Sequence, residues 1–294
     1  MKALTIFTPT YNRGYILPRL YESLCKECPT DFVWLIVDDG STDNTQALVN
    51  EWRLNAKIEI KYHFQKNGGK MRAHNRGVQL CETPLFFCID SDDAIAQGAV
   101  KRILMDYKLL ENDETLSGIV ARRQILNRSA SCDLPNVGRC SLHDIYERGF
   151  FGDTSLVFKT SILREYPFPE IEGEKFITES YVYDQIDQKY ELIIENEYLM
   201  RCEYLDDGYT ANSINLYFNY PKGWALYYSQ YYRLYAKTLW NKIKYLGYYI
   251  SMCMISKTPF FVMLQESPSP ILTLFSIPAG VKFYHRFIRE KTKS

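Results

Sequence analysis

The sequence lacks a long uninterrupted apolar run, which excludes an ordinary membrane-spanning helix. Such a helix needs roughly 18 to 20 consecutive apolar residues. The longest candidate, residues 270–284, covers 15 positions, is interrupted by Pro278 and Gly280, and includes Lys282. We therefore expect this segment to lie at a membrane surface rather than to cross a bilayer.

Signals of export and of a zinc site are also missing. Residues 1–7 run straight into a strand-like segment, without the charged start and cleavage site of a signal peptide. Cys25 and Cys28 form a CxxC pair, but no second pair or nearby histidine completes a zinc site. The eight cysteines are scattered, several of them in apolar runs, which favours buried reduced thiols. We expect a cytoplasmic protein.

The composition is that of a folded globular protein with uneven charge. Of 294 residues, 46% are hydrophobic and 24% are charged, which excludes wholesale disorder. The net charge is zero, yet from Lys222 onward 11 basic residues face two acidic ones, and the first 221 residues carry a balance of −9. A basic segment that is rich in aromatics favours an anionic membrane surface over nucleic acid.

Strand-like and helix-like patterns alternate through the first hundred residues. Short apolar runs predict buried parallel strands, and apolar residues at helical spacing predict the helices between them. The expected strands are 3–8, 32–37, 58–64 and 85–89, and the expected helices are 16–25, 41–52 and 71–80. This rhythm predicts an α/β fold with a parallel sheet wrapped by helices.

Polar residues follow three of these strands, at 8–12, 38–40 and 90–93. In open α/β sheets, ligands bind outside the carboxyl ends of the strands. We therefore expect the three segments to converge on one cleft.

Three carboxylates lie within four residues at Asp90, Asp92 and Asp93, directly after the apolar run 85–89. They repel one another unless a cation or hydrogen-bond donors compensate. Mg²⁺ or Mn²⁺ would compensate and would also hold a diphosphate. A solvated acidic turn that caps a helix is the alternative, and the buried strand before the motif favours the metal site.

A second acidic turn, Asp38–Asp39, follows the strand 32–37. Gly40 permits a tight turn, and Ser41 can cap the next helix. Local chemistry leaves a ligand role and a turn role equally open for the two aspartates, whereas we expect Asp43 to act only as a cap or turn former.

The segment Asn67-Gly68-Gly69-Lys70 does not have the spacing of a GxxxxGK[ST] phosphate loop, and the sequence has no GxGxxG motif. Kinase-like and NAD-dependent chemistry are therefore unsupported. Lys70 can still approach the phosphates or base of a nucleotide as a point charge. A plain turn with an exposed lysine is the alternative.

Taken together, these motifs resemble family 2 glycosyltransferases of the GT-A fold. The shared order is Thr8-Pro9-Thr10-Tyr11-Asn12, then Val37-Asp38-Asp39-Gly40-Ser41-Thr42-Asp43, then Asn67-Gly68-Gly69-Lys70 with Ala73 and Asn75, then Asp90-Ser91-Asp92-Asp93. The resemblance is dense over residues 1 to about 100 and weaker to about 225. It implies a mixed, mainly parallel sheet flanked by helices, with a helical C-terminal extension.

The resemblance also implies a nucleotide-sugar donor, expected to be a UDP-sugar, and a Mg²⁺ or Mn²⁺ ion. Tyr11 would lie near the base, Asp39 would accept a hydrogen bond from uracil, and Lys70 would lie beside the nucleotide. Asp90 would reach the ribose or the metal, and Asp92 would coordinate the metal. The full set of expected donor-binding residues is Pro9, Thr10, Tyr11, Asn12, Asp39, Lys70, Asp90, Ser91 and Asp92. His74 replaces an arginine common in relatives, and we expect it to be an ordinary helix residue.

The catalytic base is expected later in the chain, because inverting transfer needs a carboxylate to take the proton of the acceptor hydroxyl. Residues 176–182 resemble the acidic base motif of the family, with Ser180 in place of its second acid. Glu179 is the expected base, although a carboxylate at a helix start also suits the helix dipole. Asp184 and Glu174 are the reserve candidates. Residues 206–210, Asp-Asp-Gly-Tyr-Thr, resemble a later segment of bacterial relatives and receive no role.

The expected organisation is a catalytic domain at 1–221 and a basic, aromatic, helical tail at 222–294. Residues 1–100 form the nucleotide-binding half and 101–221 the acceptor half. Aromatic and lysine side chains between Trp240 and Lys257 predict membrane contact, and the alternative is an ordinary packed helix with a solvated basic face.

The sequence thus predicts an inverting glycosyltransferase at the inner face of the cell membrane. Its acceptor would be a lipid-linked glycan in bacterial surface polysaccharide synthesis. A sugar-nucleotide pyrophosphorylase is one alternative, but residues 8–12 lack its Gly-rich activation loop. The other is an inactive membrane-bound partner protein, which the intact acidic cluster disfavours.

Overall fold

The computed structural model describes residues 2–127, 132–203 and 213–293. The chain divides into two compact units. The first comprises Met1–Pro167 and Val182–Tyr204, and the second comprises Phe168–Tyr181 and Leu205–Ser294. We call them the sheet unit and the helical unit. The functional division at Lys222 stays a prediction, whereas the structural division assigns residues 168–181 to the helical unit.

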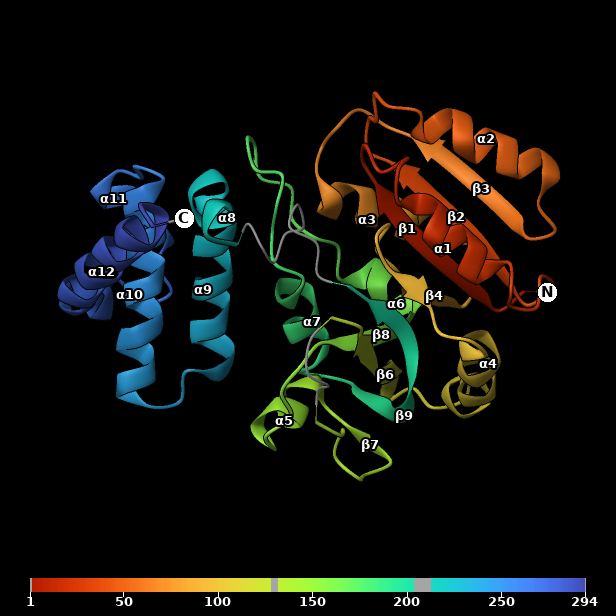
Figure 1. The fold of residues 1–294 in the computed structure, drawn as a ribbon. Helices are drawn as coiled ribbons and strands as arrows, with labels where there is room; N and C mark the ends of the chain where they lie inside the picture. Colours follow the sequence, from red (N-terminus) through yellow and green to blue (C-terminus); the bar gives the residue numbers. More distant parts are fainter. Residues whose placement is uncertain (1, 128–131, 204–212, 294) are drawn as a thin grey trace. The chain divides into compact units, whose positions relative to one another are not determined.

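A single nine-stranded sheet organises the sheet unit (Figure 1). The strand order is β3-β2-β1-β4-β8-β6-β9-β5, and β7 pairs with β9. The strands are β1 (Leu4–Thr10), β2 (Phe32–Asp38), β3 (Glu59–Phe64), β4 (Leu85–Cys88), β5 (Ala94–Ile95), β6 (Leu116–Ile125), β7 (Arg139–Cys140), β8 (Thr154–Lys159) and β9 (Glu191–Cys202). Strands β1 to β4 are parallel, and β8 joins β4 in antiparallel orientation, so the sheet is mixed.

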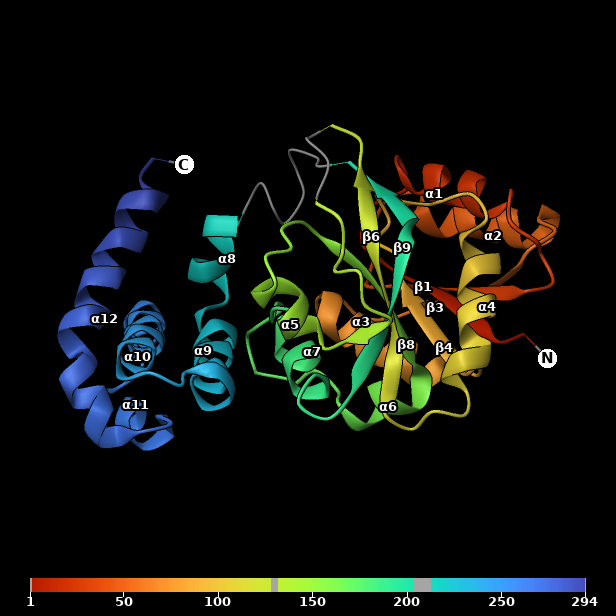
Figure 2. The ribbon, with the colours of Figure 1, turned by 90° about the horizontal axis from the view of Figure 1, so that it is seen from below.

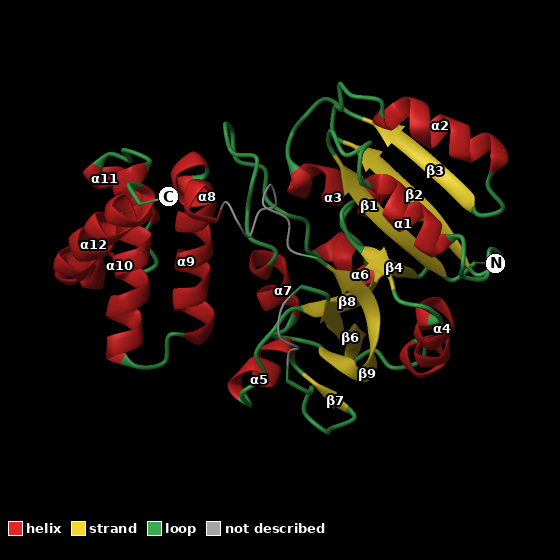
Figure 3. Ribbon diagram, in the orientation of Figure 1, coloured by secondary structure: helices red, strands yellow, loops and turns green. Residues whose placement is uncertain are grey.

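Helices cover both faces of this sheet (Figure 3). The helices of this unit are α1 (Leu17–Leu24), α2 (Thr45–Asn55), α3 (Lys70–Leu80), α4 (Ala99–Leu110), α5 (Leu142–Glu147) and α6 (Thr160–Glu165), and α7 (Ser180–Ile186) begins two residues before the unit boundary. Helices α1, α2 and α4 pack in one core with alternate strand residues such as Ile6, Trp34 and Phe87. The opposite face of β1 packs on α3, where a Cβ on Gly77 would lie 2.3 Å from the Phe7 ring.

Strand β1 continues two residues beyond the expected end at Thr8, although residue 9 is proline. Asp39 N donates to Thr10 O at 2.8 Å, whereas Ile89 N donates to Phe7 O at 2.9 Å, so alternate residues of β1 face β2 and β4. Pro9 therefore faces the β4 side, where the ladder has already ended at Phe7 and Cys88. Its missing N–H breaks no ladder bond, which is why proline is tolerated here.

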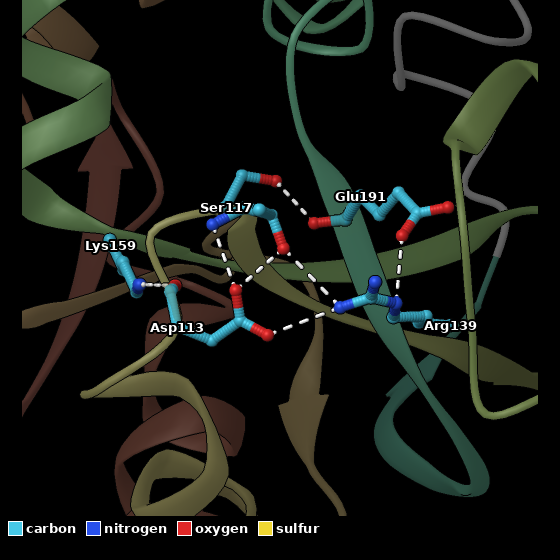
Figure 4. A network of polar contacts seen from close by, with 6 residues as sticks. Asp113, Ser117, Arg139, Lys159 and Glu191 are labelled. Atoms are coloured by element: carbon cyan, nitrogen blue, oxygen red, sulfur yellow. Dashed lines mark hydrogen bonds and ion pairs between the residues drawn. The ribbon is translucent and has the colours of Figure 1, made fainter.

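A polar network ties together the amino ends of β6 and β9, at the opposite edge from the carboxyl ends of the parallel strands (Figure 4). Arg139 of β7 bridges Asp113 at 3.1 Å and Glu191 at 2.9 Å. Lys159 Nζ donates to Asp113 O at 2.6 Å, and Ser117 Oγ donates to Glu191 O at 3.1 Å. These contacts join β6, β7, β8 and β9, so we assign the network to the fold rather than to chemistry.

In the described part of the helical unit, residues 213–293 form the helices α8 (Ser213–Asn219), α9 (Pro221–Tyr235), α10 (Leu239–Ile255), α11 (Phe260–Glu266) and α12 (Pro270–Lys291). Figure 2 shows α9, α10 and α12 side by side, with α11 beside the amino-terminal part of α12. Helices α10 and α12 approach closely at two glycines, because a Cβ on Gly280 would lie 2.4 Å from Ile250, and one on Gly247 would lie 2.9 Å from Phe283.

Most of the tail tyrosines pack inside this unit. Tyr228 stacks on Tyr248, whose ring stacks on Phe283 with centroids 4.3 Å apart. Tyr249 is 3% exposed and donates its hydroxyl to Met263 O at 2.8 Å. The aromatic residues of 240–257 therefore do not form the expected lipid-facing surface, since α9 and α12 cover them. Trp240, at the start of α10, is the exception at 76% exposed.

Within the part of the chain that the structure describes, no helix is both long enough and apolar enough to span a bilayer. The candidate segment 270–284 forms most of α12, which continues through Pro278 to Lys291.

Candidate functional site

The three polar segments that follow strands converge at one edge of the sheet, as expected. Strands β1 and β2 end beside each other, with Thr10 opposite Asp38. Strand β4 runs parallel on the other side of β1. The turn after β4 begins at Ile89 and closes with a hydrogen bond from Asp93 N to Asp90 O at 3.1 Å. Residues far apart in the sequence thus share the carboxyl edge of the parallel strands.

Asp39 organises the Gly-rich segment that precedes α3. Its Oδ1 accepts from Gly68 N at 2.9 Å and from Gln65 Nε2 at 2.7 Å. Its Oδ2 accepts from Gly69 N at 2.7 Å and from Asn67 Nδ2 at 3.1 Å. The side chain is only 4% exposed. Because each carboxylate oxygen accepts about two hydrogen bonds, the acceptor sites of Asp39 are filled by the protein itself.

The next residue of the same segment reaches the other acidic turn. Lys70 Nζ lies 2.7 Å from Oδ1 and 2.8 Å from Oδ2 of Asp90. Gly69, whose φ of +96° suits glycine, places Lys70 at the first position of α3. Asp39 and Asp90 are therefore connected through two consecutive residues, Gly69 and Lys70.

Asp92 and Asp93 lie in an electrostatically costly environment. Burial raises the pKa of Asp92, and the neighbouring Asp90 carboxylate raises it further, against the opposing effects of its backbone N–H, Arg13 and Lys70. Burial also raises the pKa of Asp93, whose carboxyl group is hydrogen-bonded to the Cys202 thiol and lies near Arg123. A buried carboxylate whose charge is disfavoured gains most from a nearby cation.

Two other residues of these turns have structural partners. Asp38 Oδ1 accepts from Ser41 N and Oδ2 accepts from the Tyr62 hydroxyl, both at 2.7 Å. Asn12, with a φ of 52°, accepts at Oδ1 from Thr42 N at 2.7 Å and donates its backbone N–H to Ser41 Oγ at 2.8 Å. We therefore assign both side chains the positioning of the strand-end loops.

Asp43 is a turn former, as expected. Its carboxylate accepts from Gly14 N and Thr45 N, each at 3.0 Å, and from the Thr45 hydroxyl at 2.6 Å. His74 is likewise an ordinary α3 residue, 6% exposed and packed edge-on against Phe7 and Phe86.

Within the described part of the chain, the end of β1 carries one buried hydroxyl without a partner and one exposed ring. Thr10 is 3% exposed, and its Oγ1 has no hydrogen-bond partner among the residues that the structure describes. A buried hydroxyl without a partner costs free energy that a ligand hydrogen bond would recover. Tyr11, the next residue, is 48% exposed, so its ring can stack on a flat ligand. Pro9 and Ser91, two further residues expected to bind the donor, are buried.

Arg13 is a site residue that the sequence reasoning missed. Its charge lowers the pKa of Asp92, and its guanidinium contacts Tyr15, which is 63% exposed. The sequence did carry a signal for Arg13: it directly follows Asn12 in the loop after β1, where a positive charge can face the acidic cluster. Gln65 was also missed, because nothing local predicts that its amide binds Asp39.

The oxygen ligands at this edge suit a divalent cation that also binds a diphosphate. Mg²⁺ is usually held by one or two carboxylates together with substrate phosphates. Asp90 and Asp92 are two such carboxylates; Lys70 already pairs with Asp90, whereas burial and the Asp90 charge raise the pKa of Asp92. Among the described residues, no group of three or more His, Cys, Asp or Glu side chains is arranged around one metal position. The two carboxylates therefore fit a cation that completes its shell with phosphate and water.

The expected base and its reserves differ in their surroundings. Glu179 is half-buried and directly precedes α7, at the end of a loop in the helical unit. Glu174 is 8% exposed, and its two oxygens accept from Lys222 N at 3.3 Å and Gly223 N at 2.9 Å, so it caps α9. Asp184 lies in α7, where burial and then Asp187 raise its pKa to about 7. Residues 206–210 lie outside the described residues.

The strand-end segments described above lie in a part of the chain that matches a known protein family. The sequence model described as "Glycosyl transferase family 2" matches residues 5–163. Chondroitin synthase of Escherichia coli is 33% identical over 105 residues, and the teichoic acid poly(glycerol phosphate) polymerase of Staphylococcus epidermidis is 33% identical over 101 residues. These alignments cover 36% and 34% of this chain but only 15% and 14% of the two relatives.

Solved structures share the fold over nearly the whole chain. TarS residues 1–349 from S. aureus, in complex with UDP-GlcNAc, superpose with a TM-score of 0.62 at 17% identity, covering 100% of this chain and 92% of that one. The mannosyltransferase PcManGT from Pyrobaculum calidifontis, in complex with GDP-Man and Mn²⁺, gives a TM-score of 0.57 at 16% identity, covering 98% and 83%. The fold is therefore GT-A, with a helical C-terminal region.

Proposed function

The chain belongs to glycosyl transferase family 2, and we propose that it is an inverting, metal-dependent enzyme acting on a UDP-sugar. Its acceptor is a hydroxyl of a lipid-linked glycan in surface polysaccharide synthesis. The names of similar proteins support a UDP-sugar donor and a surface polymer as product: TarS was solved with UDP-GlcNAc, and two relatives are a chondroitin synthase and a teichoic acid poly(glycerol phosphate) polymerase. Family membership favours transfer over the pyrophosphorylase alternative.

One observation carries the proposal. The segment 67–70 joins the two acidic turns, because Gly68 and Gly69 are held by Asp39 and Lys70 is held by Asp90. A lysine charge, two carboxylates and the Thr10 hydroxyl at the end of β1 lie along the carboxyl edge of the parallel strands, and we infer that the donor binds there. These are the groups needed to hold a ribose, a diphosphate and a cation together.

The roles of the donor residues follow from their surroundings. Tyr11 stacks on the base, and Thr10 supplies a hydrogen bond that it does not make within the protein. Asp39 shapes the base pocket by fixing the Gly-rich segment, and a direct contact with uracil requires one of its four present donors to yield. Asp90 and Asp92 would hold Mg²⁺ or Mn²⁺, and the ion would stabilise the charge that develops on the leaving diphosphate.

Glu179 is the proposed base. As the acceptor oxygen attacks the anomeric carbon, a new C–O bond forms, the bond to the diphosphate breaks, and the hydroxyl proton passes to the carboxylate. Glu174 is unsuited to this role because its oxygens are used in capping α9. Asp184 is the matched rival, since a pKa of about 7 also suits a general base.

Transfer assays with the two single variants Glu179→Gln and Asp184→Asn test this assignment. With a panel of UDP-, GDP- and dTDP-sugars and Mn²⁺, we expect Glu179→Gln to keep donor affinity and lose about 100-fold or more in transfer rate. Asp184→Asn should transfer at close to the wild-type rate, and NMR of the product should show an inverted anomeric centre. Normal transfer by Glu179→Gln, or a retained configuration, would reject the proposed mechanism.

Membrane association through the tail completes the proposal and places the enzyme at the inner face of the cell membrane. The +9 balance of residues 222–294 supports attraction to anionic lipid. This attraction would bring the enzyme to an acceptor that is itself anchored in the bilayer.

A further inference from the structure

Exposed apolar side chains of the helical unit concentrate on α11 and on the first turns of α12. Phe261 is 82% exposed, Ile271 75% and Phe275 74%. Phe260, Val262 and Leu274 are also exposed. Single exposed apolar residues are normal, whereas a cluster of this kind marks an interaction surface. We call these six side chains the apolar tip.

The apolar tip belongs to helices that pack and hydrogen-bond within the helical unit. Met263 of α11 is 6% exposed and receives the Tyr249 hydroxyl on its carbonyl. The Ser267 and Thr273 hydroxyls form a hydrogen bond, and Ser269 O accepts from Thr273 N at 2.9 Å. The turn from α11 to α12 is thus internally bonded, and α11 lies at the amino-terminal end of α12 (Figure 2).

The exposed face of α12 changes from apolar to basic along its length. Residues at helical spacing on one stripe are Ile271, Phe275, Pro278, Lys282, Arg286 and Arg289, all of them exposed. The opposite stripe includes Thr273, Ser276, Gly280 and Phe287, which are buried in the unit. The stripe is therefore apolar over its first two turns and basic beyond them, where Arg286 also pairs with Glu290 at 2.8 Å. Glu266 is the one acidic residue between positions 254 and 282.

The distances along this stripe match those of a lipid interface. At 1.5 Å rise per residue, the apolar part from Ile271 to Pro278 is about 10 Å long, and Arg286 lies about 16 Å beyond Phe275. Interfacial helices bury apolar side chains about 5–10 Å into the boundary of headgroups and acyl chains. A helix that enters with its amino-terminal end first would therefore bring Lys282 and Arg286 to the level of the phosphates.

We propose that the apolar tip of α11 and α12 inserts into the cytoplasmic leaflet, with Lys282, Arg286 and Arg289 on anionic headgroups. The occupant is an anionic lipid surface rather than a protein, because the cationic end of the same face complements phosphate charge. This inference rests on the proposed function, in which the tail meets a membrane. It names the surface that does so, and it excludes the aromatic residues buried between α9, α10 and α12.

Flotation of the full chain with vesicles tests the proposal. Vesicles of phosphatidylcholine with 30% phosphatidylglycerol should carry the wild type, and pure phosphatidylcholine should carry at least tenfold less. The triple variant Phe261→Ser, Ile271→Ser, Phe275→Ser should lose at least tenfold in partitioning. Trp240→Ser is the matched control, because Trp240 is 76% exposed on the same unit but lies at the far end of α10, and it should float like the wild type.

Two further measurements separate the possible causes. Charge neutralisation by Lys282→Gln should weaken binding about fivefold, since each cation near the surface contributes about 1 kcal/mol, and 0.5 M salt should remove this difference. In a Phe261→Trp variant, brominated lipid should quench tryptophan fluorescence more strongly than in the wild type, and a damaged protein would not produce this increase in quenching.

The outcomes also distinguish this inference from the proposed function. The triple variant should keep wild-type affinity for UDP and the wild-type unfolding profile. Loss of flotation by Trp240→Ser with an unchanged triple variant would overturn the assignment of the surface. Concentration-dependent dimers that the triple variant abolishes, together with no binding to vesicles, would show that a second copy covers the tip. Failure of UDP binding in the wild type would reject the proposed function instead.

Discussion

Replacing Asp39 with asparagine should unfold the Gly-rich segment that it holds. The amide nitrogen that the substitution introduces would take the place of Oδ1 or Oδ2. At either place, the nitrogen would face one glycine N–H and one side-chain amide. The side-chain amides of Gln65 and Asn67 can rotate and accept, but the N–H of Gly68 or Gly69 cannot. At least one hydrogen bond to a charged acceptor is therefore lost and a buried donor is left unpaired.

The expected cost follows from these contacts. Hydrogen bonds to charged groups contribute about 1.5–3 kcal/mol, and an unpaired buried donor adds about 1–3 kcal/mol. We expect Asp39→Asn to lower the free energy of unfolding of the sheet unit by about 2.5–6 kcal/mol. The change is measured from urea unfolding followed by tryptophan fluorescence, with Asp31→Asn at a turn before β2 as the control carboxylate-to-amide change.

A local measurement makes the test sharper. Hydrogen exchange of the peptide that covers residues 65–70 should accelerate by at least tenfold in Asp39→Asn, and UDP affinity should fall because Lys70 loses its anchor at Gly69. A variant with lower UDP affinity but unchanged stability and exchange would refute this reasoning. Such a result would mean that Asp39 acts as a ligand only.

Three further changes test other parts of the structure. Asp184→Asn should stabilise the protein relative to the wild type, and this gain should grow as the pH rises from about 4 to about 7, by up to about 1.4 kcal/mol per pH unit. The reason is that the folded wild type holds a proton on Asp184 that the unfolded state releases. Thermal melts that show the same difference at every pH would contradict this. Glu174→Gln should cost about 1–2 kcal/mol by weakening the α9 cap while transfer activity persists, and a loss of activity at unchanged stability would point to a role in the chemistry. Gly77→Ala should destabilise by about 1–3 kcal/mol because the new methyl group meets the Phe7 ring, whereas Gly138→Ala, with open space around it, should not, and equal melting of the two variants would argue against close packing of α3 on β1.

Periodicity was enough to predict the parallel strands β1 to β4 of residues 1–100 and the helices between them. Strand β2, expected at 32–37, ends one residue later, and helix α3, expected at 71–80, begins one residue earlier. The convergence of strand-end turns followed from the parallel sheet alone. Local chemistry left a ligand role and a turn role open for Asp39, and it could not predict the four hydrogen bonds that the Asp39 carboxylate accepts from residues 65–69, 26 or more positions away in the sequence.

Contacts between distant residues were the part that the sequence could not supply. The cap that Glu174 provides for α9 spans 48 positions, and no local pattern predicts it. The aromatic residues of α10 have the composition of an interface helix, but whether a neighbour covers them depends on α9 and α12. Close approach of α10 and α12 at Gly247 and Gly280 buries that face, and the exposed apolar residues lie on α11 and the start of α12 instead.

Calorimetric titration of UDP in the presence and absence of Mn²⁺ tests most directly whether the acidic turns form one cation-dependent donor site. In the wild type, Mn²⁺ should tighten UDP binding at least tenfold, and Asp92→Asn should remove that gain while leaving binding without metal unchanged. If Asp92→Asn responds to Mn²⁺ as strongly as the wild type does, the site described at the ends of β1, β2 and β4 is wrong.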